Sequence, residues 1–205
     1  KADDEMRLKI RHETIYRYGN TAYSAVQLLR LTPRSSEAQF VRKWRVTIDA
    51  DARLDRGEDA FGNITHLAFI EGDYSELRIL VEGEVETFDT GGSVRGGVER
   101  QPDRLFLRET ALTVATPAIR ALARGALASE GGDCLSGLHR INAHLHANMR
   151  FDVAATTSVT TAGASFEAQA GVCQDFAHIF IAAARSVGIP ARYVSGYFLL
   201  TDRIE

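Results

Sequence analysis

The sequence lacks the features that mark membrane-spanning and nucleic-acid-binding proteins. No apolar run approaches the roughly 18 residues that a membrane-spanning helix needs, so we expect no membrane partner. Lys and Arg number 24 against 27 Asp and Glu, which gives a net charge of -3. No basic cluster offsets this balance, and a chain without a basic patch lacks the electrostatic footprint of a nucleic-acid-binding protein.

Cysteine is scarce, which excludes a disulfide framework and a cysteine-rich metal site. The chain has two cysteines, Cys134 and Cys173, and their spacing matches no metal-ligand motif. The first five residues are charged and lack the apolar core of a secretory signal. Both observations favour a reduced, cytoplasmic setting, unless a signal segment is removed before residue 1.

Residues 6–95 have the alternating pattern of half-buried strands. Apolar side chains alternate with charged or polar ones at period two in several stretches, and a turn signal lies at residues 59–63. The stretches are residues 8–18, 25–31, 40–49, 64–70 and 77–86. Five or more strands joined by short turns predict an antiparallel β-sandwich-like domain.

The pattern changes at the glycine-rich stretch 91–97, which we expect to be a linker. No Gly-Lys-Ser/Thr follows it, so a phosphate loop is not supported. Residues 100–205 form the second predicted domain, in which apolar positions recur at helical spacing. Thr116 and Pro117 provide an N-cap and a first-turn proline for one helix, and Asp133 can cap the next.

Three further expectations concern this second domain. Cys134 falls on the apolar stripe of its helix, which predicts core packing. Residues 151–165 are rich in Thr, Ser and Ala and are expected to be a polar loop, and residues 191–200 have a strand-like pattern. Strands followed by helices make the whole chain α+β.

The most informative stretch begins at Cys173, which opens a strongly apolar helical pattern. The core-facing positions are Phe176, Ile179, Phe180, Ala183 and Val187, and Gly188 and Pro190 end the pattern. Cys173 therefore lies in the first turn of a helix of about 15 residues, where backbone N–H groups and the helix dipole favour a thiolate. Its spacing from Phe176 suggests that it points toward the packed side. Cys173 is thus a candidate nucleophile, and a small buried hydrophobic residue is the alternative.

A thiol nucleophile needs a base, and none of the histidines is well placed by sequence to be one. His178 follows Cys173 at an angle of about 140° around the helix, at about 100° per residue, so we expect a structural role for it. His139, His144 and His146 share one helix but project from different turns or sides. This arrangement argues against a shared metal site.

Two adjoining runs closely resemble the core of a known family. They read GVCQDFAH at residues 171–178 and GIPARYVSGY at residues 188–197. In these runs the chain is similar to the bacterial transglutaminase-like cysteine proteases, in which a β domain precedes a papain/transglutaminase-like α+β core. The resemblance implies that Cys173 is the nucleophile of a Cys-His-Asp triad. Gln174 and Asp175 match the family motif and are assigned a supporting role.

The activity that the resemblance implies is acyl transfer on peptide or carboxamide bonds. Cys173 would form a thioester with the substrate, and its own backbone N–H is a candidate oxyanion donor. This chemistry needs no cofactor and no metal. The expected substrate is a peptide or protein, including the peptide part of peptidoglycan. Hydrolysis is favoured over cross-linking because nothing in the sequence indicates a site that keeps water from the thioester.

The sequence departs from the family pattern after the Cys173 helix. The family has its triad His in a His-Ala-Trp-like motif and its Asp in an Asp-Pro-like motif, and neither motif follows here. Residues 100–205 are therefore expected to be a truncated core, inactive or nearly so alone, because loss of one triad member removes several orders of magnitude in rate. A non-catalytic protein- or peptidoglycan-binding module is the alternative. An arylamine acetyltransferase-like activity matches the motifs less well.

Overall fold

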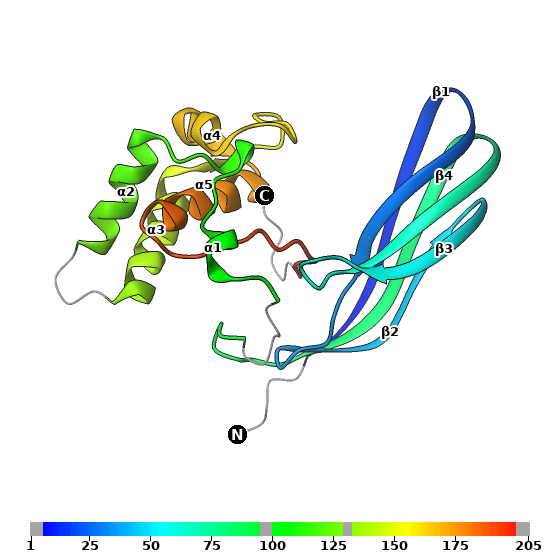
Figure 1. Cartoon of the computed structure of the whole chain (residues 1–205), viewed down its shortest axis with the longest axis horizontal. Helices are drawn as coiled ribbons and strands as arrows, with labels where there is room; N and C mark the ends of the chain where they lie inside the picture. Colours follow the sequence, from blue (N-terminus) through cyan, green and yellow to red (C-terminus); the bar gives the residue numbers. More distant parts are fainter. Residues whose placement is uncertain (1–5, 95–99, 129–132, 200–205) are drawn as a thin grey trace. The chain divides into compact units, whose positions relative to one another are not determined.

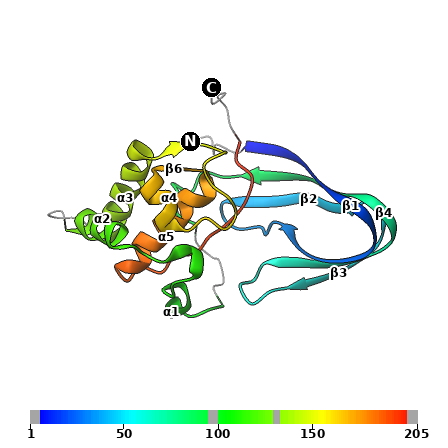
Figure 2. The same ribbon diagram turned by 90° about the horizontal axis from the view of Figure 1, so that it is seen from above.

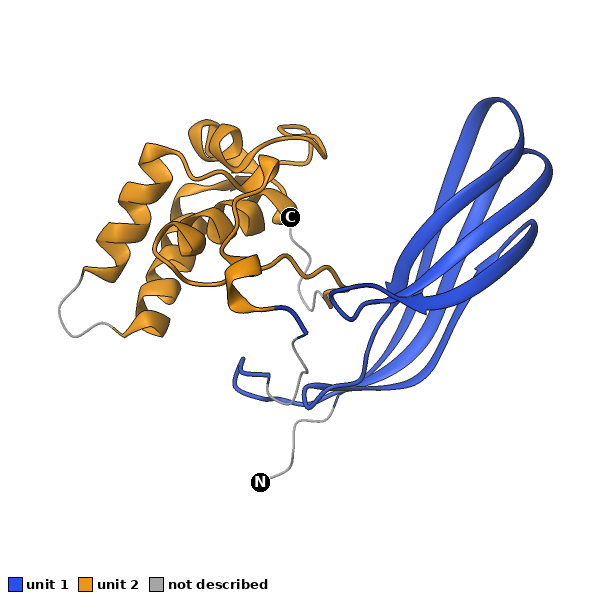
Figure 3. Cartoon of the chain, in the orientation of Figure 1, with its two compact units in different colours: residues 1–101 blue, residues 102–205 orange. Residues whose placement is uncertain are grey.

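The chain divides into two compact units. The computed structural model describes residues 6–94, 100–128 and 133–199. The units comprise residues 1–101 and 102–205 (Figure 3), and Figure 1 labels their helices and strands.

The division falls just after the predicted glycine-rich linker. Residues 95–99, which include the last part of that stretch, lie outside the described residues. The described part, through Val94, contains a turn in which the N–H of Gly91 donates to the carboxylate of Asp89 at 2.8 Å. Gly91 and Gly92 both have positive φ, the conformation for which glycine is suited.

Four strands form one antiparallel sheet in the first unit. In chain order they are β1 Met6–Thr32, β2 Gln39–Ile48, β3 Asp51–Glu58 and β4 Ile64–Thr87. β4 lies in the middle, with β1 along one side. The other side of β4 is shared, because β3 pairs with residues 64–71 and β2 pairs with residues 79–87.

The long strands β1 and β4 bend, so that the sheet folds back on itself (Figure 2). Trp44 lies opposite Gly83 on β4, and Leu31 lies near the position opposite Ile64. In a straight strand these two places would be about 60 Å apart. The indole N–H of Trp44 nevertheless donates to the carbonyl oxygen of Leu31 at 2.8 Å. Register shifts in the β1–β4 ladder and the positive φ of Gly72, +111°, mark the bend.

Folding back gives the sheet an interior. One cluster of buried side chains comes from β1 and β4 and consists of Leu29, Ala68, Ile70, Leu77 and Ile79. Val46 of β2 and Leu54 of β3 pack against them although the two strands pair with different parts of β4. Each large aliphatic side chain buried in this way contributes about 1.5–3 kcal/mol.

The α+β class and the antiparallel first domain predicted from the sequence are confirmed. The prediction of five or more strands is wrong, because residues 8–18 and 25–31 belong to one bent strand and residues 64–70 and 77–86 to another. A bulge shifts the alternation of side chains, which makes one bent strand look like two. The described residues of the first unit form one folded sheet, and the sandwich stays a prediction. The strand β3 was not predicted.

The second unit is built mainly from helices. Its elements are α1 Asp103–Phe106, the 3-10 helix η1 Ala111–Thr113, α2 Pro117–Leu127, α3 Cys134–Asn148, β5 Arg150–Phe151, α4 Ala162–Ala168, β6 Ala170–Gly171 and α5 Cys173–Ser186. Both predicted N-caps are present. The Thr116 hydroxyl accepts the N–H of Ile119 at 3.3 Å, and the Asp133 carboxylate accepts the N–H of Ser136 at 2.7 Å. Across the described residues, we find no helix whose length and apolar content would let it cross a membrane.

The core of this unit lies between α2, α3 and α5. One isoleucine from each of these helices is fully enclosed: Ile119, Ile141 and Ile179. Small side chains on α5, including Ala182 and Ala183, let the neighbouring helices approach closely. The apolar stripes that predicted these helices are the faces that pack together.

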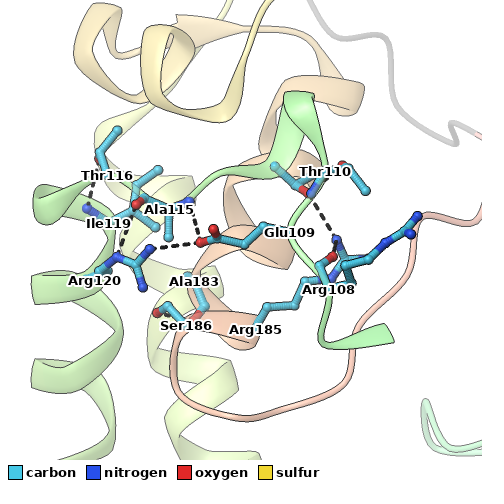
Figure 4. Close-up of polar contacts among 11 residues, drawn as sticks. Arg108, Glu109, Thr110, Ala115, Thr116, Ile119, Arg120, Ala183, Arg185 and Ser186 are labelled. Carbon is cyan, nitrogen blue, oxygen red and sulfur yellow. Dashed lines mark hydrogen bonds and ion pairs between the residues drawn. The ribbon is translucent and has the colours of Figure 1, made fainter. Parts of the chain in front are cut away.

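Polar contacts fix the C-terminal end of α5 and the N-terminal end of α2 (Figure 4). The Arg185 guanidinium donates to the carbonyl oxygens of Ala191 and Arg108. Arg120 of α2 pairs with the Glu109 carboxylate at 2.8 Å. The chain segments before α2 and after α5 are therefore tied to the helix core by arginine side chains.

Three sequence expectations for this unit are wrong in whole or in part. Cys134 is exposed, because it is the first residue of α3; the buried position one turn later is Gly137, which packs against Leu127. The predicted polar loop is confirmed for residues 152–161, but residues 162–165 belong to the short helix α4. Residues 191–199 pair with no strand in the described part of the chain, and a strand is defined by its hydrogen-bonded partner.

We predict that Gly83→Ala destabilises the first unit. A Cβ at this position would lie 2.1 Å from the Trp44 ring, so the indole or the strand must move, at a cost of about 1–3 kcal/mol. Gly19→Ala on β1 is the control, because nothing lies within 4 Å of a Cβ there. Trp44, the single tryptophan of the chain, reports unfolding of this unit by fluorescence in urea. Equal unfolding midpoints for the two variants would contradict the packing assigned to Gly83.

Candidate functional site

The start of α5 presents Cys173 to solvent. Two residues of buried strand β6 lead into Val172, the N-cap, and Cys173 is the first residue of the helix. The prediction of a cysteine in the first turn is confirmed. Its expected orientation toward the packed side is wrong, because Cys173 is exposed. Side chains tilt toward the N-terminus of their helix, so a first residue extends past the helix end.

Asp175 fixes the place where α5 begins. Its carboxylate is buried, with 1% of the residue exposed, and it accepts two hydrogen bonds. One comes from the backbone N–H of Val172 at 2.8 Å and the other from the hydroxyl of Thr156 at 2.6 Å. A carboxylate in the first turn also interacts favourably with the helix dipole. Asp175 therefore joins the helix start to the loop after β5.

The parallel pairing of β5 with β6 brings that loop to the helix. Arg150 lies opposite Ala170 and Phe151 opposite Gly171, so the chain leaves both strands at the same edge. One strand continues into the Thr156 loop and the other into Cys173. We call this arrangement, made by Thr156, Val172 and Asp175, the Asp175 clasp.

Gly171 and Ser165 complete the packing beneath the clasp. The buried hydroxyl of Ser165 donates to the carbonyl oxygen of Ala170 at 2.8 Å. A Cβ on Gly171 would lie 2.7 Å from an oxygen of Asp175 and 2.8 Å from the Ser165 hydroxyl. Glycine is thus required here because the carboxylate and the hydroxyl occupy the space of a side chain.

His178 is buried one turn further along α5. Its ring lies 5.7 Å from the Tyr193 ring, and its Nδ1 has no hydrogen-bond partner in the described residues. Burial lowers the pKa of His178, and the charge of Asp175 opposes this shift. The imidazole is therefore neutral at pH 7 and supplies no positive charge to a thiolate.

The remaining predicted residues have simpler surroundings. Gln174 is partly buried at the second position of α5. The backbone N–H groups of Cys173 and Gln174 belong to the first helical turn, whose donors have no partner four residues earlier in the helix. Such donors can stabilise a developing oxyanion. His139, His144 and His146 all lie on α3, and within the described ranges no three His, Cys, Asp or Glu side chains form a group that could hold a metal ion.

Sequence reasoning placed Cys173, Gln174 and Asp175 together but missed Thr156. The role of Thr156 depends on the β5–β6 pairing, which two-residue strands do not reveal by periodicity. The available signal was the glycine before the helix together with an acidic residue in its first turn, which indicates a crowded, capped helix start.

Comparison with known proteins identifies the family. Residues 8–86 match the bacterial transglutaminase-like N-terminal region, and residues 120–203 match the transglutaminase-like superfamily. The chain is 32% identical over 201 residues to the uncharacterized protein ML0607 of Mycobacterium leprae, covering 93% of this chain and 71% of that protein. The chain belongs to the bacterial transglutaminase-like family, as the two sequence runs predicted.

A further relative and a solved structure of the same fold extend the comparison. The uncharacterized protein Rv2569c of Mycobacterium tuberculosis is 29% identical over 210 residues, covering 96% of this chain and 67% of that protein. The crystal structure of a "Putative Cysteine Protease" from Cytophaga hutchinsonii has the same fold, with a TM-score of 0.69 at 18% identity. The match covers 91% of this chain and 65% of that one, so the chain spans slightly less than two thirds of the solved protein.

We predict that Thr156→Val weakens the clasp. The variant leaves one lone pair of the buried Asp175 carboxylate without its donor, which costs about 1–3 kcal/mol of unfolding free energy. Thr156→Ser should restore stability, because it keeps the hydroxyl. Far-UV circular dichroism measures the effect, since the helices of the described residues all lie in the second unit.

Thr157→Val, in the same loop, is the matched control. Thr157 is exposed, and among the described residues its hydroxyl has a hydrogen bond only with the nearby Thr160, at 3.5 Å. We therefore expect a change within about 0.5 kcal/mol. The clasp is refuted if valine at 156 and valine at 157 shift the unfolding midpoint equally.

Proposed function

We propose that the whole protein is a thiol-dependent acyl-transfer enzyme that acts on peptide or carboxamide bonds, with Cys173 as nucleophile. The observation that carries the proposal is the exposed position of Cys173 at the first residue of a helix, in a chain of the transglutaminase-like family. A solvent-facing thiol can meet a carbonyl carbon, whereas a thiol in the core cannot. The clasp below it holds the helix start in one place.

The proposed reaction has two steps. Cys173 attacks the carbonyl carbon and forms a thioester, and the amine or ammonia departs with a proton. Water then attacks the thioester, releasing the acid and the thiol. The first-turn N–H groups of Cys173 and Gln174 would stabilise the oxyanion in each step. The exposure of Cys173 supports hydrolysis over transamidation, because water reaches the thioester readily.

General-base catalysis is proposed to come from the histidine and aspartate that the family resemblance implies. No motif in residues 1–205 matches them, and His178 is buried and neutral. The inactivity of residues 1–205 alone stays a prediction. Enzymatic activity should be assayed with the full-length protein. A peptide or protein substrate, including a peptidoglycan peptide, is the proposed partner, and the proposed location is the cytoplasm.

We predict that iodoacetamide labels Cys173 at least ten-fold faster than Cys134 in the full-length protein at pH 6.5. The comparison is closely matched, because both cysteines are exposed and each is the first residue of a helix. A difference in rate therefore reports the chemistry around the thiol rather than access. Mass spectrometry of the tryptic peptides gives both rates from one sample.

Equal labelling rates would overturn the nucleophile assignment. Turnover provides the second readout, as ammonia release from a glutaminyl peptide by the full-length protein. Cys173→Ala should abolish release above background, and Cys134→Ala should leave it unchanged. Release that survives Cys173→Ala would place the chemistry elsewhere.

A further inference from the structure

The folded sheet of the first unit has a half-open pocket that the acyl-transfer chemistry does not use. It lies between residues from both halves of the sheet and has a volume of about 540 Å³. Ligand pockets in proteins commonly have volumes of about 300–1,000 Å³. Trp44 and Val46 from β2 and Leu54 from β3 give it apolar walls. The pocket is therefore large enough for a small organic molecule with an apolar body.

Two polar atoms at this pocket are buried without a partner. They are Nδ1 of His66 and the hydroxyl oxygen of Thr32, both from residues that line it. A buried polar group without a hydrogen bond is costly, so native proteins satisfy nearly all of them. Neither atom has accessible surface, so a ligand with hydrogen-bonding oxygens can satisfy them only if the Thr32 and His66 side chains turn toward the pocket.

Arg56 adds a positive charge to the same wall. Its guanidinium makes no ion pair within the described residues, whereas Arg34, the other arginine of the pocket, pairs with Glu58. The charge of Arg56 also reaches His66, since burial first and Arg56 second lower the pKa of that imidazole. His66 is neutral, so its ring can donate one hydrogen bond without adding charge.

We propose that this pocket binds a carboxylate that carries an apolar or aromatic body. The carboxylate lies on Arg56, and the Thr32 hydroxyl and the His66 ring donate to it after their side chains have turned toward the pocket. The body packs against Trp44, Val46 and Leu54. A guanidinium is suited to a planar carboxylate. Both a free N-acyl amino acid and the C-terminal residue of a peptide have this chemistry. The site is separate from Cys173 and does not rest on the proposed reaction.

Titration with N-acetyl-phenylalanine, followed by fluorescence, tests the proposal directly. Trp44 is the single tryptophan of the chain and lines the pocket, so its emission reports binding without a label. N-acetyl-phenylalaninamide is the neutral control. We expect a saturable change in Trp44 fluorescence with the acid. The amide should bind at least ten-fold more weakly, because it lacks the negative charge that strengthens the hydrogen bonds to Arg56.

Arg56→Gln should weaken binding of the acid about ten-fold and leave binding of the amide unchanged. Arg53→Gln is the matched control on the same strand: Arg53 pairs with Asp55 and lies over the Phe69 ring, outside the pocket. It should bind the acid as the wild type does. If Arg56→Gln fails to fold, the comparison of acid and amide binding in the wild type still tests the proposal.

The peptide acetyl-Ala-Ala-Phe distinguishes the two sources of the carboxylate. Tighter binding than that of N-acetyl-phenylalanine identifies a peptide C-terminus as the ligand, and equal or weaker binding identifies a small free acid. The proposal is overturned if acid and amide bind equally, or if Arg56→Gln binds the acid as tightly as wild type. It is also overturned if neither fluorescence nor calorimetry detects saturable binding of any probe at millimolar concentration.

Discussion

The buried carboxylate of Asp175 is the constraint on which the candidate catalytic site depends. It has to be buried because α4, β6 and the Thr156 loop surround the start of α5, and it has to be hydrogen-bonded because an unpaired buried carboxylate is costly. The N–H of Val172 and the hydroxyl of Thr156 satisfy it. These two hydrogen bonds hold the chain where it enters α5, next to Cys173. Gly171 follows from the same constraint, since a side chain there would collide with the carboxylate.

In the first unit the corresponding constraint is the bend of β1 and β4. A flat sheet of this length would leave two faces in water, and folding back lets Val46 and Leu54 share one interior with Ile70 and Ile79. The contact between Trp44 and Gly83 holds one half of the sheet closely packed. The pocket beside Trp44 is lined by residues from both halves. We regard it as a binding site rather than a packing defect because of Arg56 and the two buried polar atoms without a partner, on Thr32 and His66.

Much of the second unit could be predicted from the sequence, because its signals are local. The caps at Thr116 and Asp133, the apolar stripe of α5 and the stop at Gly188 each act within a few residues. The errors arose where contacts between residues far apart in the sequence determine the local structure. Side-chain alternation cannot show that one strand bends and continues, so β1 and β4 were divided. Thr156 was missed because only the β5–β6 pairing brings it to Asp175. The exposure of Cys173 and Cys134 follows from their positions at the ends of helices. Assigning side chains to helix faces from sequence spacing does not take this into account.

The most direct test of the central claim is to locate the acyl group during the reaction. The full-length protein would be mixed with an activated ester of a peptide carboxylic acid, quenched in acid and digested for mass spectrometry. The account predicts an acyl group on Cys173 that hydroxylamine removes, with Cys134 unmodified. An acyl group on Cys134 to the same extent, or none on Cys173 while ester is consumed, would contradict the assignment of Cys173 as the nucleophile.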